Sequence, residues 1–308
     1  MADTNPTPPS YGPYETNPKF PLPDGEISIN IYGYTPSIIL GIVGIVVFLI
    51  GLVAHTFWLF KYRTTRVFEA LVAWTCLMEV VGYGGRAAAS KNPFLLNPFI
   101  IQYFFIVVAP VFLAAALYWA LSVIIRSRPA YRSLSPLGPR MLIAVFVIFD
   151  VLTIFAQVVG AAFIGASESQ SGRGKVPFIS PDNANNIVIA GLAVQAAAFL
   201  VFLLIFVFFF VRLYGKNSPI TASERPNPKM FVTILVAGVL IYMRTLFRLA
   251  ESAQGLISQI SRNQALFGVF ETMPIMLTVL ILAAFPLGRF TDFNKARTQQ
   301  EIAGEKHS

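Results

Sequence analysis

Seven charged side chains interrupt long apolar stretches of the sequence, and these are the residues best suited to do chemistry. A charge at the centre of a membrane costs about 2.5–3.5 kcal/mol on insertion scales, so such residues face a protein interior or a water-filled cavity. Four are acidic and three are basic, and we therefore expect them to pair with one another inside a helix bundle. They are Glu79, Arg86, Asp150, Arg244, Arg248, Glu251 and Glu271.

The spacing of these charges places several of them on shared helix faces. Glu79 and Arg86 are seven residues apart, which is two turns of one helix. Arg244, Arg248 and Glu251 follow an i, i+4, i+7 pattern. Residues three or four positions apart on a helix are neighbours, so Arg248 and Glu251 are expected to contact directly.

Other polar residues in the apolar stretches have simpler expected roles. Glu79, Asp150 and Arg244 fall near the middle of their stretches, and we expect them to be partners between helices. His55 is expected to donate or accept a hydrogen bond between helices rather than to bind a ligand. Glu69 lies near the end of its stretch, where it is expected to reach water.

The elements that must position these residues are membrane-spanning helices. A helix needs about 20 mostly apolar residues to cross the hydrocarbon core. The hydrophobic fraction is 56%, and the charged fraction is 12% against about a quarter in soluble domains. The composition and the runs predict an all-α, polytopic membrane protein with a bundle of seven transmembrane helices. The runs are Ser37–Phe60, Val67–Ala89, Pro98–Ile125, Arg140–Ile164, Asn186–Leu213, Lys229–Gly255 and Gln264–Phe285.

Lys and Arg alternate between the connections in a way that predicts orientation. Of 23 such residues, 15 lie in connections 1–2, 3–4 and 5–6 and after the last run, whereas 5 lie on the other side. Cytosolic connections carry the excess of positive charge. We therefore expect an external, Pro-rich, disordered tail at 1–35, the transmembrane domain at 36–288 and a cytosolic tail at 289–308. The net charge of +8 then needs no nucleic-acid partner.

Several functional classes are disfavoured by what the chain lacks. Its single cysteine, Cys76, excludes an internal disulfide, and two histidines exclude a three-histidine metal centre. No G-x-x-x-x-G-K-[ST] loop is present, which argues against ATP-driven pumping. An intramembrane hydrolase is weakly supported, because no zinc-binding cluster or serine–histidine pairing is indicated. We expect no cofactor, no metal and no catalytic residue, and hence not an enzyme.

The predicted orientation gathers polar residues in the outer half of the bundle. We infer an outer polar cavity that narrows to a charged plug near the midplane. The alternative is that buried ion pairs only fix helix register. The residues assigned to the outer half are Arg86, Gln102, Gln157, Gln195, Arg248, Glu251 and Glu271.

Three further features bear on helix packing. Pro110 and Pro274 lie near the middles of their runs, where each frees a backbone carbonyl and can kink its helix. The stretch Gly82–Gly85 is expected to allow close helix approach. The aromatic run Phe206–Phe210 is expected to contact lipid.

Ordered motifs along the runs resemble a known family. The strongest are E-V-V-G-Y-G-G-R from Glu79 to Arg86 and R-T-L-F-R-L-A-E from Arg244 to Glu251. Together with the further positions given at the end of this paragraph, these motifs resemble the fungal RTA-like, lipid-translocating exporter family, which is linked to resistance to sphingoid bases and aminocholesterol. The resemblance runs from Tyr34 to about Arg289. The other matching positions are Tyr34–Ser37, Gln102, Ala109, Pro110, Ala115, Tyr118, Asp150, Gln157, Gly160, Gly191, Leu192, Gln195, Phe199 and Gly255.

The sequence departs from the family pattern at several positions. Ser122 and Val123 replace a glycine–arginine pair, and Gly160–Ala162 replaces a triple glycine. Gln264 stands where an acid tends to open helix seven, whereas Glu271 keeps the charge of a family aspartate. These changes concern substrate identity more than fold.

The resemblance implies export or transbilayer movement of amphiphiles such as sphingoid long-chain bases, with membrane lipids as partners and the plasma membrane as location. Glu79, Glu251 and Glu271 would hold an ammonium headgroup while its tail stays in lipid. Movement would be downhill or coupled to protons through a carboxylate.

The alternative is a seven-helix sensor that regulates lipid asymmetry or a stress response indirectly. However, D-R-Y after the third run and N-P-x-x-Y in the seventh are absent, and the seventh run has no lysine for retinal. The sequence does not indicate an oligomeric state.

Overall fold

The computed structural model describes residues 15–19, 23–27, 30, 32–172, 178–216, 218–221, 224–255 and 262–290, apart from the side chains of 165–172 and 181. Within these ranges, seven helical segments are long and apolar enough to cross a membrane. They confirm the predicted all-α bundle of seven spans. The first six spans contain α1 (Ile38–Lys61), α2 (Arg66–Ala89), α3 (Leu96–Ser127), α5 (Pro139–Gly172), α6 (Pro181–Tyr214) and α7 (Pro228–Ala253).

The seventh span is composite. It contains a short helix α8 (Gln264–Leu266), a π-helix η3 (Phe267–Thr272) and a longer helix α9 (Met273–Ala284). Two small elements lie in connections: the 3₁₀ turn η1 (Arg63–Thr65) and the helix α4 (Pro129–Arg132). The predicted ends agree with these bounds to within a few residues, except that α5 continues to Gly172.

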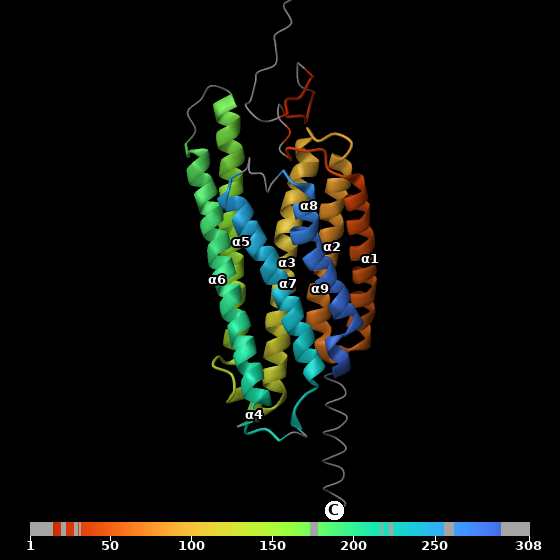
Figure 1. The fold of residues 1–308 in the computed structure, drawn as a ribbon, viewed down its shortest axis with the longest axis vertical. Coiled ribbons are helices and arrows are strands. Elements are labelled where there is room, and N and C mark those ends of the chain that lie inside the picture. The colour runs from red at the N-terminus through yellow and green to blue at the C-terminus, as the bar shows by residue number, and fades with distance from the viewer. Residues whose placement is uncertain are drawn as a thin grey trace, which may run out of the picture.

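The spans form a closed bundle whose helices run roughly parallel to its long axis (Figure 1). Each span packs on the next, from α1 through α2, α3, α5, α6 and α7 to α9, and α9 returns to contact α1. In addition α3 contacts α7 across the bundle, so α3 occupies an interior position. Below, the amino-terminal end means the end at which α1 begins, α2 ends and α3 begins.

Local sequence explains where several helices begin. The side chains of Ser180, Asn227 and Asn263 each accept a backbone N–H bond from the first turn that follows. Pro181 and Pro228 then occupy the first helical position, where a missing N–H costs nothing. These caps satisfy groups that a helix end otherwise leaves unbonded.

The perimeter of the bundle is apolar. Val53, Leu152 and Phe155 are 69%, 60% and 68% exposed, and most other large exposed hydrophobic residues also lie on the long helices. Contiguous apolar surface of this kind marks a membrane or protein interface. A surrounding bilayer is therefore the solvent that this surface fits.

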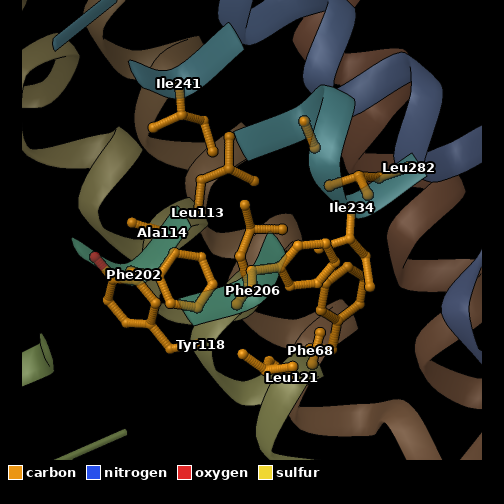
Figure 2. Close-up of a cluster of buried hydrophobic side chains, with 14 of the residues drawn as sticks. Phe68, Leu113, Ala114, Tyr118, Leu121, Phe202, Phe206, Ile234, Ile241 and Leu282 are labelled. Atoms are coloured by element: carbon orange, nitrogen blue, oxygen red, sulfur yellow. The ribbon is translucent and has the colours of Figure 1, made fainter. Parts of the chain in front are cut away.

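An aromatic core fills the half of the bundle away from the amino-terminal end. Phe202 and Phe206 of α6 lie among side chains of α2, α3 and α7 (Figure 2), and the Phe202 ring is 4.6 Å from that of Tyr118. The prediction that the run 206–210 contacts lipid is wrong for Phe206 and Phe209, which are 1% and 0% exposed. Residues three apart share a helix face, so these two point inward while Phe208 points outward.

Close contact between α2 and α3 depends on glycine, as the sequence predicted. A Cβ on Gly85 would lie 2.9 Å from the carbonyl oxygen of Pro98 and 3.0 Å from the backbone nitrogen of Gln102. A Cβ on Gly84 would meet nothing within 4 Å. Gly85, rather than its neighbour, therefore sets how closely the two backbones approach.

The described part of the expected tail packs on the connection between α2 and α3. The Glu26 carboxylate accepts hydrogen bonds from Asn17, Lys19 and Asn92. The Ile27 N–H donates to the carbonyl oxygen of Phe94 at 2.9 Å. This part of segment 1–35 is thus ordered, whereas residues 1–14 and 291–308 lie outside the described ranges. The external placement of this end stays a prediction.

Candidate functional site

Four charged side chains from α7 and η3 form an ionic cluster, in which Arg244 and Glu271 are buried and Arg248 and Glu251 are partly buried. Oε1 of Glu271 accepts a hydrogen bond from Nη2 of Arg244 at 2.6 Å and lies 3.2 Å from Nε of Arg248. Arg248 in turn donates to Glu251 at 2.8 Å, as the spacing predicted. The cluster contains two arginines and two glutamates, so its formal charges cancel.

The π-helix gives Glu271 its position in this cluster. In η3 the Met273 N–H bonds to the carbonyl of Gly268, five residues back. Pro274 follows and cannot donate the bond that an α-helix would direct to Phe270. π-Helical turns are frequent at functional sites. The sequence indicated a disturbance at Pro274 but not its form.

The other two mid-span acids lie in different surroundings. Glu79 of α2 is 1% exposed, and the charges that act on it are those of Arg244, Glu271 and Arg248. Asp150 of α5 lies instead beside Tyr118 of α3, although its Oδ2 has no hydrogen-bond partner within the described residues. The expected pairing of Asp150 with Arg244 is therefore replaced by the pairing of Arg244 with Glu271.

Two glutamines join α5 to α6. Nε2 of Gln157 donates to Oε1 of Gln195 at 2.8 Å. This bond pairs an N–H of Gln157 with the side-chain oxygen of Gln195. Gln157 and Gln195 belong neither to the ionic cluster nor to the lining of the cavity described next.

A polar cavity of about 120 Å³ lies near the amino-terminal end of the bundle. The volume exceeds that of a single water molecule several-fold, so the cavity can hold a small polar group. Four of the ten predicted site residues line it, together with aromatic rings of the N-terminal segment, α3 and η3. The four are Arg86, Gln102, Arg248 and Glu251.

Arg86 is the most unusual group in this cavity. Its side chain is 0% exposed, and its Nη2 donates to the Tyr34 hydroxyl at 3.0 Å. The guanidinium lies 4.2 Å from the centroid of the Phe267 ring. Its Nε and Nη1, like Oε1 of Gln102, have no hydrogen-bond partner within the described ranges. Sequence reasoning expected Arg86 to pair with an acid.

A second buried polar pair lies toward the opposite end. Nδ1 of His55 is 2.7 Å from Oε2 of Glu69, and its Nε2 is 3.2 Å from the carbonyl oxygen of Val279. This confirms the inter-helix role of His55. The expectation that Glu69 reaches water is wrong, because Glu69 is 0% exposed. Nothing in sequence spacing alone pairs residues of different helices.

The donor set does not resemble a metal centre. No group of three histidine, cysteine or acidic side chains is placed to hold an ion in the part of the chain that the structure describes. Glu251 and Glu271 contact arginines instead. The arrangement is suited to binding a polar group of a ligand.

Comparison with known proteins provides independent information. The sequence model of a family described as "RTA1 like protein" matches residues 72–294. Protein RTA1 of Saccharomyces cerevisiae is 28% identical over 83% of this chain and 85% of its own length. Protoporphyrin uptake protein 1 of the same yeast is 30% identical over 74% and 70%. The yeast sphingoid long-chain base transporter RSB1 is 25% identical over 87% and 77%. No solved structure matches the chain.

Proposed function

The chain belongs to the RTA1-like protein family, and from this premise we propose that it is a transporter that moves lipid-like amphiphiles across a membrane. Sphingoid long-chain bases are the first cargo to test. Such movement would contribute to resistance to toxic lipids or drugs. The plasma membrane is the proposed location.

The observation that carries this proposal is the polar cavity inside an apolar-surfaced bundle. A polar headgroup pays a large desolvation penalty when it enters hydrocarbon unless it is hydrogen-bonded there. The cavity offers Arg86, Gln102, Arg248 and Glu251 to such a headgroup. Its alkyl chain would remain in contact with lipid, which lowers the barrier to crossing.

The names of two relatives support the same class of cargo. One is called a sphingoid long-chain base transporter and the other a protoporphyrin uptake protein. Both named compounds combine a large apolar part with polar groups.

The ionic cluster would connect the cavity to helix movement. Arg248 and Glu251 line the cavity, and Glu271 ties Arg248 to Arg244. A headgroup that competes for Arg248 would weaken the link between α7 and η3. Transport would be downhill or coupled to a proton on a carboxylate.

Reconstitution tests the proposal directly. Purified protein in liposomes is expected to accelerate transbilayer movement of a fluorescent long-chain base above that of protein-free liposomes, and the base should be recovered chemically unchanged. An Arg132→Gln variant, altered at an exposed residue of α4, should match wild type. Rates equal to those of empty liposomes would rule out direct translocation and favour a sensor that acts on lipid asymmetry indirectly.

A further inference from the structure

The cavity has a charge preference that follows from which of its ionic groups are already paired. Resting on the proposed function, we propose that the cavity recognises an amphiphile with an anionic headgroup, phosphate or carboxylate, through Arg86. This differs from the ammonium recognition that the sequence suggested. The partners of each charged group around the cavity decide which headgroup charge the cavity can bind.

The acids that line or adjoin the cavity each have an arginine partner, and Glu271, whose Oε2 accepts no hydrogen bond within the described residues, does not line the cavity. Glu251 accepts from Arg248 at 2.8 Å, and Glu271 accepts from Arg244 at 2.6 Å. Binding an ammonium group there would require displacement of an arginine already in place. The two pairs therefore offer little net attraction to a cation.

Arg86, in contrast, has no acidic partner among the described side chains. Its polar contact is the Tyr34 hydroxyl, and its remaining contacts include the Phe267 ring. Nε and Nη1 together carry three N–H donors that reach no acceptor within the described ranges. Glu79 is seven residues earlier on α2, about 10 Å along the helix axis, which is too far for an ion pair.

A buried cation without a counterion is unfavourable, because water no longer solvates it. The face of an aromatic ring compensates only in part. A phosphate or carboxylate group in the cavity would supply both the missing charge and the missing acceptors. Arginine binds such groups strongly because its planar donors match their oxygen geometry.

Gln102 adds a second requirement. Gln102 lines the same cavity, and its Oε1 is buried and has no donor within the described part of the chain. A headgroup that carries a hydroxyl or amino group beside its anionic oxygens would satisfy both residues. A phosphorylated long-chain base has this combination, whereas a free long-chain base lacks the anion.

Thermal unfolding in an uncharged detergent tests the preference with four probes: a long-chain base phosphate, a fatty acid, a free long-chain base and inorganic phosphate. We expect the two anionic amphiphiles to raise the unfolding temperature at concentrations at least about tenfold lower than the free base needs, which is about 1.4 kcal/mol of binding free energy. Inorganic phosphate should have a much weaker effect. Equal stabilisation by the free base would overturn the proposal, as would phosphate that acts as well as the lipid.

Variants of Arg86 make the test specific. Arg86→Gln should abolish the anionic preference, Arg86→Lys should keep part of it, and Arg132→Gln should leave it intact. Without ligand, Arg86→Gln should unfold at a temperature no lower than wild type, since it removes an unpaired buried charge. A large loss of stability would show a structural partner for Arg86 and contradict the proposal.

The experiments distinguish failure of the anionic preference from failure of the proposed transport function. Anionic preference that depends on Arg86, without any transport in liposomes, would refute transport and keep the binding preference. Transport of a long-chain base phosphate that is unaffected by Arg86→Gln would keep transport and refute the preference.

Discussion

The carboxylate of Glu271 and the guanidinium of Arg244 are joined by a 2.6 Å hydrogen bond inside the bundle. Arg244 is 5% exposed and Glu271 2%. The pair connects α7 to the π-helix η3. Arg244 also donates to the carbonyl oxygen of Ile106 in α3 at 2.8 Å, so three elements meet at one arginine.

Removing one member of this pair should be costly. Glu271→Gln or Arg244→Met leaves the ionic cluster with a net buried charge, and each is expected to lower the free energy of unfolding by about 3–5 kcal/mol. The double variant should be less damaged than the sum of the two, with a coupling of about 0.5–3 kcal/mol. Unfolding curves of the wild type, the two single variants and the double variant measure this coupling.

The matched control is a second cycle that pairs Arg244→Met with Asp150→Asn. Asp150 lies beside Tyr118 rather than Arg244. These two changes should therefore be additive within about 0.5 kcal/mol. A larger coupling between Asp150 and Arg244 than between Glu271 and Arg244 would contradict the described geometry.

Pro274→Ala should remove the π-helical turn and, with it, the contact between Glu271 and Arg244. The new N–H can bond to the carbonyl of Phe270 and extend α9 toward its N-terminus, which reorients Glu271 away from Arg244. We expect lower thermal stability, because the Arg244–Glu271 pair is lost, together with slower transport in liposomes. Pro110→Ala is the control, because α3 remains α-helical across Pro110. Equal effects of the two substitutions on transport would argue against a special role for η3.

Two neighbouring glycines should respond oppositely to alanine. Gly85→Ala places a Cβ against the backbone of α3 and is expected to cost about 1–3 kcal/mol. Gly84→Ala has open space and should be neutral or stabilising by up to about 1 kcal/mol through helix propensity. Unfolding temperatures of the two variants measure the difference. Similar losses in both would show that α2 and α3 are not in close contact at Gly85.

The N-terminal segment should detach in acid. Hydrogen bonds from Lys19 and Asn17 lower the pKa of Glu26 from 4.5 to about 2. A lowered pKa in the folded state stabilises the fold above pH 4.5, and this contribution is lost as the pH falls toward 2. Hydrogen exchange of residues 15–19 and 23–27 should therefore speed up over this pH range relative to the helices. Glu26→Gln should show the faster exchange already at pH 6 and little further change on acidification.

The spans could be predicted from sequence because hydrocarbon thickness and backbone hydrogen bonding leave few solutions for an apolar run. The Arg248–Glu251 pair was also predictable, since residues three apart on one helix must be neighbours.

Contacts between helices were less predictable. Arg244 had several acids at similar depth, and only the rotation of each helix selects Glu271 among them. Arg86 was expected to be neutralised, but charge balance over the whole chain does not fix pairwise distance. The burial of Glu69 depends on the approach of His55 from α1, which no pattern within α2 indicates.

The central claim is that a lipid headgroup occupies the cavity beside Arg86, and photolabelling in liposomes tests it most directly. A long-chain amphiphile with a photoreactive group next to its headgroup should crosslink to residues 99–106 of α3, and excess unlabelled amphiphile should abolish this labelling. Arg86→Gln should reduce the labelling of that segment by an anionic probe, whereas Arg132→Gln should not. Labelling confined to perimeter residues such as Val53 and Leu152, unchanged by competitor, would contradict the account.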